Sequence, residues 1–287
     1  MMQVYIVGAG KAGRCMGRAL RAAGYRVVIR SGRRPLPQRV AGDAVLVAVR
    51  DGRIGTVASE LRGRVDPGAV VLHLAGAHGP EALGALRGWC AGVGQLHPLV
   101  AFASARSCPE LRGVFAHVDG DPAARRVGRE LAKGMGMRPA TIAGIDLQSY
   151  HAAAGLVASG AVALVQAGVE ILAAQGIASS RAVAMLGPLL ASVAHNVKAL
   201  GLPGALTGVT RRGDAALAQA HLEAIERAAP GRGLLYVQLL AAQLPLARAL
   251  GEASKAQLEC LDRLVLRSAA GRRARRLTAG VERVYNH

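Results

Sequence analysis

Six residues near the start of the chain, Gly8–Gly13 (GAGKAG), constrain its fold more than any other segment. They follow an apolar, strand-like run, Gln3–Val7, and open a stretch with a helical pattern. Between a strand and a helix, the glycines of GxGxxG allow a tight turn, a close approach to a pyrophosphate and close helix–strand packing. The alternative is a tight turn without a ligand. The predicted dinucleotide-binding residues in this loop are Gly8, Gly10, Lys11, Ala12 and Gly13.

Strand and helix signals alternate through the first half of the chain. Apolar runs at Arg26–Ile29, Ala44–Val49 and Ala69–Leu74 predict strands, and Arg53–Leu61 predicts a helix. Such runs are typical of a parallel sheet covered on both faces. Shorter elements are expected at Val93–Leu96, Val114–His117 and Met137–Ile142. The fold class is therefore α/β, with an N-terminal Rossmann domain built on a mainly parallel, doubly wound sheet.

The second half has only helical patterns. Helices are predicted at His151–Gln175, Ala182–Leu200 and Asp214–Ala229, and a last helical stretch from Leu234 to Leu266 is interrupted by Pro245. We expect two domains, a dinucleotide-binding domain at residues 1–145 and an all-α substrate and dimerisation domain at residues 146–287.

The end of the second predicted strand indicates which dinucleotide is bound. A site for NAD normally has an acid there to hold the ribose hydroxyls. This chain instead has Ser31, Arg33 and Arg34, which can hydrogen-bond and pair with a 2′-phosphate. The alternative is that these arginines are ordinary surface residues. The predicted cofactor is NADP (NADPH), with further contacts at the ends of the third and fourth strands from Val49, Arg50, Ala75 and Gly76.

The composition limits which binding partners and which cellular compartment are expected for this chain. The net charge is +18, but the arginines are scattered and aromatics are only 3%, which argues against specific nucleic-acid binding.

Residues 152–169 are long and apolar enough to raise the question of a membrane span. Alanine and glycine dominate there, so a helix buried in the fold or in a homodimer interface explains the segment better. Four separated cysteines disfavour a zinc ribbon and a disulfide framework, and no spacing suggests a metal cluster. With no visible signal peptide, we expect a reducing cytoplasm and no membrane association.

Three histidines lie near predicted strand or helix ends: His73, His97 and His151. Histidine exchanges protons near neutral pH, so each is a candidate acid or base, although a lone histidine in an apolar strand is more often structural. In the second half, residues 205–214 form an unusual segment. There Arg212 is a candidate carboxylate clamp or an exposed partner for an acid, and Asp214 is a candidate helix N-cap.

Several of these segments together resemble a known family, the Rossmann-like NADP-dependent proteins whose C-terminal half is a domain of unknown function. It belongs to the superfamily of ketopantoate reductase, pyrroline-carboxylate reductase, prephenate dehydrogenase and the 6-phosphogluconate dehydrogenases. The matching pieces span nearly the whole chain: residues 8–13, 49–54, 72–77, 96–102, 150–154, Asn196, 205–208, 212–214 and 221–222. The resemblance implies a Rossmann domain joined to a helical, dimer-forming domain, with an active site between them. Two positions depart from the pattern: Ser159 stands at or next to an expected asparagine, and Val209 replaces an expected proline.

We expect an NADPH-dependent oxidoreductase that transfers a hydride to a small carbonyl or imine compound, with an anionic, ketopantoate-like 2-keto acid favoured. His151 is the first choice as proton donor and His97 the second. The expected substrate-binding residues are Asn196, Thr207, Arg212, Asp214 and Ser159. One alternative is oxidation, as in prephenate dehydrogenase. The other is a non-catalytic NADP-binding sensor or scaffold protein, which the departure at Ser159 supports.

Overall fold

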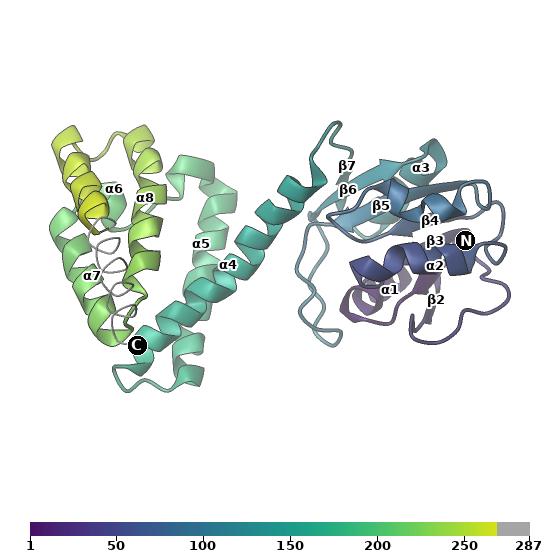
Figure 1. Cartoon of the computed structure of the whole chain (residues 1–287), viewed down its shortest axis with the longest axis horizontal. Helices are drawn as coiled ribbons and strands as arrows, with labels where there is room; N and C mark the ends of the chain where they lie inside the picture. Colours follow the sequence, from purple (N-terminus) through teal and green to yellow (C-terminus); the bar gives the residue numbers. More distant parts are fainter. Residues whose placement is uncertain (269–287) are drawn as a thin grey trace, which may run out of the picture. The chain divides into compact units, whose positions relative to one another are not determined.

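The computed structural model describes residues 1–268. The chain forms two compact units, the first Met1–Ala158 and the second beginning at Ser159 (Figure 1). The long helix α4 (Leu147–Ala173) contributes residues to both.

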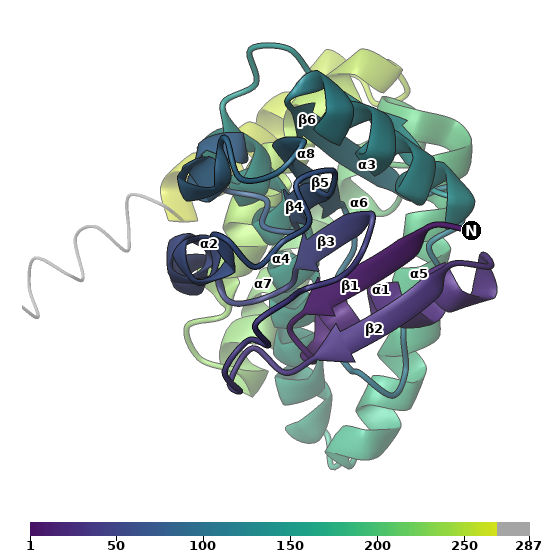
Figure 2. The same cartoon turned by 90° about the vertical axis from the view of Figure 1, so that its right-hand side faces the viewer.

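A seven-stranded sheet forms the framework of the first unit, with the strand order β2-β1-β3-β4-β5-β6-β7. Figure 2 shows β1 lying between β2 and β3. All neighbouring strands are parallel except β5 and β6, which are antiparallel. The mainly parallel α/β class is thereby confirmed. The strand bounds are β1 Gln3–Val7, β2 Arg26–Arg30, β3 Ala44–Val47, β4 Val70–His73, β5 Gly92–Pro98, β6 Phe115–Gly120 and β7 Arg138–Ala140.

Both faces of this sheet are covered, because its side chains alternate between two apolar cores. On one face Met16 and Leu131 pack with Leu72. They come from α1 (Lys11–Ala22) and α3 (Pro122–Gly134), of which α3 has no counterpart among the predicted helices. On the other face Ile54 and Leu83 pack with strand valines. These two come from α2 (Ile54–Leu61) and the 3₁₀ helix η2 (Pro80–Leu86), and a second 3₁₀ helix, η1 (Asp51–Arg53), precedes α2.

The second unit is helical. After α4 come α5 (Ser179–Gly204), α6 (Val209–Arg212), α7 (Ala215–Ala228) and α8 (Gly233–Leu250), and residues 255–268 are also helical. Its core joins Leu222, Leu240 and Leu261. The predicted interruption at Pro245 is wrong, because α8 continues through that residue and ends at Gly251, whose φ of 69° only glycine adopts readily.

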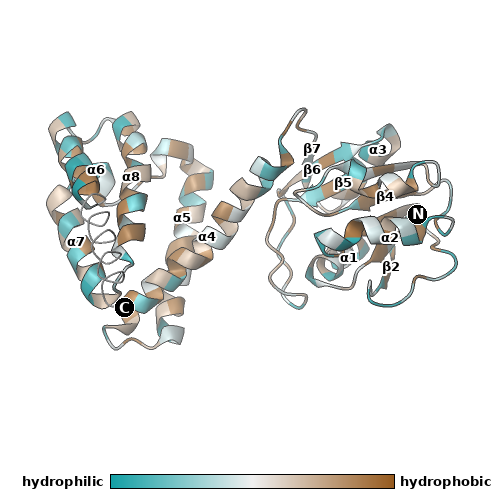
Figure 3. Ribbon diagram, viewed as in Figure 1, coloured by the Kyte–Doolittle hydropathy of each residue, from teal (hydrophilic) through white to brown (hydrophobic). Residues whose placement is uncertain are grey.

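Two helices of this unit are largely uncovered. In α4 only Ala167 and Val169 are buried, and in α5 only Ala182. Figure 3 shows hydrophobic residues along both helices. Three helical segments (α4, residues 179–212, and α8) are long and apolar enough to cross a membrane by length and composition alone. Within one chain, the burial expected for His151–Gln175 is therefore not achieved.

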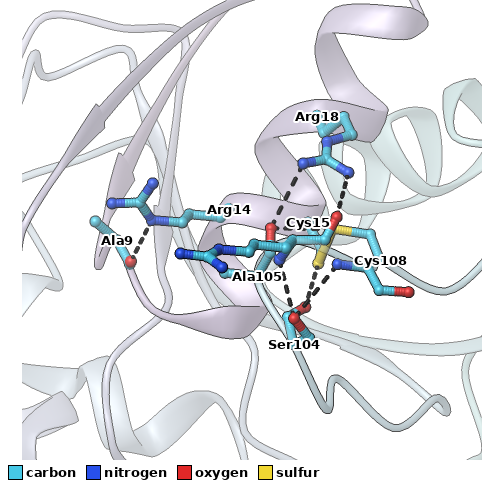
Figure 4. The surroundings of a disulfide bond; sticks show 9 residues. Ala9, Arg14, Cys15, Arg18, Ser104, Ala105 and Cys108 are labelled. Atoms are coloured by element: carbon cyan, nitrogen blue, oxygen red, sulfur yellow. Dashed lines mark hydrogen bonds between the residues drawn. A yellow bond between two sulfur atoms is a disulfide. The ribbon is translucent and has the colours of Figure 1, made fainter.

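Two of the scattered cysteines form a disulfide. Cys15 in α1 is bonded to Cys108 in the loop between β5 and β6 (residues 99–114), with their Cα atoms 5.3 Å apart (Figure 4). The expectation that these cysteines form no disulfide is wrong for this pair. The two cysteines are 93 residues apart in the sequence, but the loop 99–114 folds back onto α1 and brings their side chains together. Cys90 and Cys260 are free thiols.

Candidate functional site

The glycine loop has the geometry of a phosphate cradle. Gly8 has φ +126°, and a Cβ there would lie 2.2 Å from the Ala48 carbonyl oxygen. A Cβ on Gly13 would lie 2.0 Å from the Gly8 carbonyl oxygen, whereas one on Gly10 would meet nothing within 4 Å. The first and third glycines are thus required by packing, and the second faces open space. Because α1 begins without a side-chain cap or an acid in its first turn, its N–H groups suit an anion.

The end of β2 presents two cations beside this loop. A turn closes where the Arg34 amide donates to the Ser31 carbonyl oxygen at 3.1 Å, and the Arg33 amide donates to Ser31 Oγ at 3.3 Å. Both guanidiniums are exposed, and within residues 1–268 neither has a hydrogen-bond or ion-pair partner. A dinucleotide carrying a 2′-phosphate would supply an anion for these arginines.

The predicted cofactor residues converge on one edge of the sheet. Strands β1, β3, β4 and β5 run parallel, so their carboxyl ends lie at the same edge, where open α/β sheets bind ligands. A Cβ on Gly32 would lie 2.9 Å from Val49 Cγ1 and 3.9 Å from Gly8 Cα. The segment after β4 is held to β5, because the Gln95 side-chain amide donates to the Ala75 carbonyl oxygen at 2.6 Å.

The two predicted catalytic histidines meet above Gly76. His97 Nδ1 lies 2.9 Å from the Leu74 carbonyl oxygen, which can only accept, so the neutral ring carries its free lone pair on Nε2. A Cβ on Gly76 would lie 2.8 Å from His97 Nε2 and 2.5 Å from His151 Nδ1. The ring centroids of His97 and His151 are 5.9 Å apart. Burial lowers the pKa of His97, and the neighbouring His151 lowers it further. The neutral acceptor Nε2 of His97 therefore faces the exposed side chain of His151.

Two further residues at this site were not predicted from the sequence. The Tyr150 ring centroid lies 5.7 Å from that of His97 and 5.9 Å from that of His117. Within residues 1–268 the buried Tyr150 hydroxyl and His117 Nδ1 have no hydrogen-bond partner, a state that buried polar atoms rarely tolerate without water or a ligand. Burial raises the pKa of Tyr150 and lowers that of His117, which keeps the hydroxyl protonated and the imidazole neutral.

The contacts of His73 fit the structural alternative, although its buried Nδ1 has no hydrogen-bond partner within residues 1–268. His73 is fully buried, its Nε2 donates to the Gly79 carbonyl oxygen at 2.9 Å, and burial lowers its pKa. In residues 1–268 no three His, Cys, Asp or Glu side chains gather into a group that could hold a metal ion.

The remaining predicted substrate residues belong to the second unit. Asn196 on α5 is half-buried, whereas Ser159, Thr207 and Arg212 are exposed. Asp214 caps α7 by accepting a hydrogen bond from the Leu217 amide at 3.0 Å. This is the helix-capping role expected from the sequence, the other expected role being substrate binding.

The anchored arginine of this segment is Arg211. It pairs with Glu252 and donates to the Leu206 carbonyl oxygen at 2.9 Å. Arg212 has no such partner among residues 1–268, so its guanidinium remains available to a ligand.

Gly76 offers a sharp test of the histidine arrangement. The change Gly76→Ala places a methyl group against His97 Nε2 and His151 Nδ1, at distances that real Cβ atoms do not show. We expect the two rings to separate and turnover to fall by about tenfold or more, since small misplacements of catalytic groups are costly. Steady-state kinetics and dinucleotide titration measure the effect, and Gly84→Ala, which meets nothing within 4 Å, is the control. Unchanged turnover in Gly76→Ala contradicts a role for this arrangement.

The fold defines the class as a Rossmann-like α/β protein with a helical second unit. Comparison with known proteins confirms the resemblance found in the sequence. Residues 114–243 match the model of a family described as "Domain of unknown function (DUF2520)". No curated protein matches the chain.

Solved structures show the same fold. Protein TM1727 from Thermotoga maritima is 21% identical, with a TM-score of 0.66, over 86% of this chain and 98% of that one. The 1-pyrroline-5-carboxylate reductase of Streptococcus pyogenes is 14% identical, with a TM-score of 0.54, over 91% and 97%. The pyrroline carboxylate reductase of Plasmodium falciparum, solved with NADP bound, is 11% identical, with a TM-score of 0.57, over 87% and 98%.

Proposed function

We propose that this protein is an NADPH-dependent oxidoreductase that reduces a small carbonyl or imine compound. The observation that carries the proposal is the pair of histidines over Gly76, at the same sheet edge as an open glycine loop. In a sheet with this strand order, a dinucleotide whose pyrophosphate lies at Gly8–Gly13 extends from β2 towards β4 and β5. The nicotinamide ring of the dinucleotide would then lie beside His97.

Each residue group has one task in this proposal. The glycine loop and the start of α1 hold the pyrophosphate, and Arg33 and Arg34 hold the 2′-phosphate. NADPH supplies the hydride when bound. His151, exposed and next to His97, delivers a proton to the oxygen or nitrogen that gains charge. His97 Nε2 accepts a hydrogen bond from a hydroxyl group of the substrate, which a hydroxylated 2-keto acid offers, and the Tyr150 hydroxyl donates one to a substrate oxygen.

For the substrate we propose an anionic 2-keto acid, because Arg212, which the sequence predicts to bind substrate, has no side-chain partner within residues 1–268 and can pair with a carboxylate. The test is NADPH consumption, followed by absorbance, over a panel of 2-keto acids and cyclic imines. Turnover of a 2-keto acid supports the proposal. Binding of NADPH without consumption across the panel would support the non-catalytic sensor or scaffold instead.

One observation favours the oxidative direction as a second candidate. With Nδ1 committed to Leu74, neutral His97 can take a proton at Nε2 from a substrate hydroxyl. Its lowered pKa makes this neutral form dominant at neutral pH.

The pH dependence checks this second candidate. Above its pKa His97 is neutral and below it the ring is protonated, so kcat/KM for oxidation is expected to rise with pH through a pKa below the ordinary histidine value. The profile of His97→Asn should lack this rise. A rise in His97→Asn like that of the unchanged protein would rule out His97 as the base.

We also propose that a second copy of this chain covers α4 and α5. Val162 is 69% exposed and Leu189 is 59% exposed, and contiguous apolar surfaces of this kind mark interaction sites. Asn196 and Lys198 lie in the same uncovered helix, where lipid would leave a charge unsolvated, so a protein partner fits better than a membrane.

Light scattering checks the assembly. A homodimer is expected at micromolar concentration, and Leu189→Arg should convert it to a monomer because a charge would be buried in the interface. Leu266→Arg, at a leucine that is 67% exposed outside α4 and α5, is the matched control. A monomeric unchanged protein contradicts the proposal, and recovery only with membranes and detergent would favour a lipid partner.

A further inference from the structure

A cavity of about 630 Å³ lies against the disulfide on the surface of the first unit. The disulfide, the side of α1, the loop 99–114 and the end of α3 line it. We infer that this cavity is a thiol–disulfide exchange site, which admits a small thiol bearing a negative charge and directs it at Cys108. This inference does not depend on the proposed oxidoreductase activity.

The charges around the cavity select an anion. Arg18, Arg112 and Lys133 line it together with a single acid, Glu110. The ion pair between Arg112 and Glu110 is long, at 3.9 Å, and both side chains are exposed, so it neutralises little. Lys133 has no partner within residues 1–268. The excess of positive charge raises the local concentration of an anionic thiol.

The two sulfurs differ in access, which sets the direction of attack. Cys15 is 2% exposed, whereas Cys108 is half-buried and faces the cavity. An external thiolate forms a bond to Cys108 Sγ while the bond between Cys108 and Cys15 breaks, and Cys15 leaves as a thiolate that then takes up a proton. A second thiolate attacks the external sulfur of the mixed disulfide and releases Cys108. In sum, two external thiols are oxidised to one disulfide and the protein disulfide is reduced to two thiols.

The leaving group is stabilised where it forms. Arg18 is three residues after Cys15 in α1 and lines the same cavity, so its guanidinium places positive charge near the sulfur that leaves. A nearby positive charge stabilises a thiolate and makes it a better leaving group. In the reducing compartment that the sequence predicts, disulfides are usually transient or redox-sensing.

Opening the bond removes the covalent anchor of the loop, whose far end stays attached where the Gly113 amide donates to the Gly136 carbonyl oxygen at 2.8 Å. Near the disulfide the remaining anchor is Arg18, whose guanidinium donates to the Arg106 carbonyl oxygen at 3.1 Å and to the Ala105 carbonyl oxygen at 3.5 Å (Figure 4). The loop follows directly after Pro98, next to His97. Thiol exchange would therefore loosen the loop 99–114, which follows the strand that carries His97 and is anchored to α1.

The experiment uses the full-length protein and three small thiols of different charge: mercaptoethanesulfonate, mercaptoethanol and cysteamine. Alkylation with mass spectrometry should find two reactive cysteines before reduction and four after it. Each reduction rate is divided by the rate of the same thiol on a small uncharged disulfide, which cancels differences in nucleophilicity. The anionic thiol should then be about tenfold faster than the cationic one at low salt, with the advantage lost towards 1 M salt.

Variants separate the cavity from general surface charge. The double change Arg112→Gln and Lys133→Gln should abolish the charge preference, whereas Lys255→Gln, in the second unit, should preserve it. Trypsin should also cut at Arg106 and Arg112 faster in Cys108→Ser than in the disulfide form. Four free thiols that resist mild oxidation, or equal normalised rates for all three thiols, would overturn the inference.

Discussion

Replacing His97 by asparagine is expected to lower kcat/KM for oxidation, in which His97 is the proposed base, by about 10²–10⁴-fold, the usual contribution of acid–base catalysis by a positioned side chain. Asparagine places an amide N–H where Nδ1 stands, so the hydrogen bond to the Leu74 carbonyl oxygen at 2.9 Å can persist while Nε2 is lost. Steady-state kinetics of the reverse, oxidative reaction measures the effect, with the reduced form of the compound found by NADPH consumption as the substrate. NADPH affinity should change little, because His97 is not among the residues proposed to hold the phosphates.

His151→Ala is the companion variant, with a loss of similar size expected in the reductive direction. His73→Gln serves as the control for substituting a buried histidine, because a glutamine amide N–H can reach the position of Nε2 and keep the hydrogen bond to the Gly79 carbonyl oxygen. Normal turnover in both His97→Asn and His151→Ala would show that water or the Tyr150 hydroxyl carries the proton.

The joint change Arg33→Ala and Arg34→Ala is expected to remove the preference for NADPH over NADH. A hydrogen bond to a charged group contributes about 1.5–3 kcal/mol, so the ratio of the two affinities should fall by roughly tenfold or more. Titration followed by fluorescence measures both affinities. NADH binding should be nearly unchanged, because it has no 2′-phosphate for these guanidiniums.

Arg30→Ala is a matched control for the same region. Its guanidinium already donates to the Pro35 carbonyl oxygen at 2.7 Å, so it has less to offer a ligand. An unchanged preference after loss of Arg33 and Arg34 would exclude them as the 2′-phosphate site. A preference for NADH in the unchanged protein would assign the cofactor as NAD.

The sequence predicts most of the sheet, because apolar strand runs followed by glycine turns are local signals. Gln3–Val7 is a strand with the predicted bounds. The antiparallel pairing of β6 could not be predicted in this way, since strand direction depends on how a long loop returns. Helix α3 escaped prediction although it buries Val127 and Leu131. Its many arginines mask the apolar spacing.

The sequence identifies the candidate histidines of the site, but it does not show which side chains lie next to one another. His97 and His151 are 54 positions apart by their numbers, and only the fold shows that both approach Gly76. His117 gave no signal of its own, because its place beside His97 follows from the register of β5 and β6. Tyr150 stands next to His151 in the sequence, and that adjacency was the one clue to it.

The reversed strand β6 also limits where this chain can change in length. His117 is paired with His97, and its neighbours Ala116 and Val118 point into the core on the opposite face. Side chains alternate along a strand, so one residue inserted before His117 within β6 would send its imidazole into that core and turn an apolar side chain towards Tyr150. An insertion between Val100 and Ser104 would leave this register intact. Homologous chains should therefore differ in loop length before Cys108 and keep β6 constant in length.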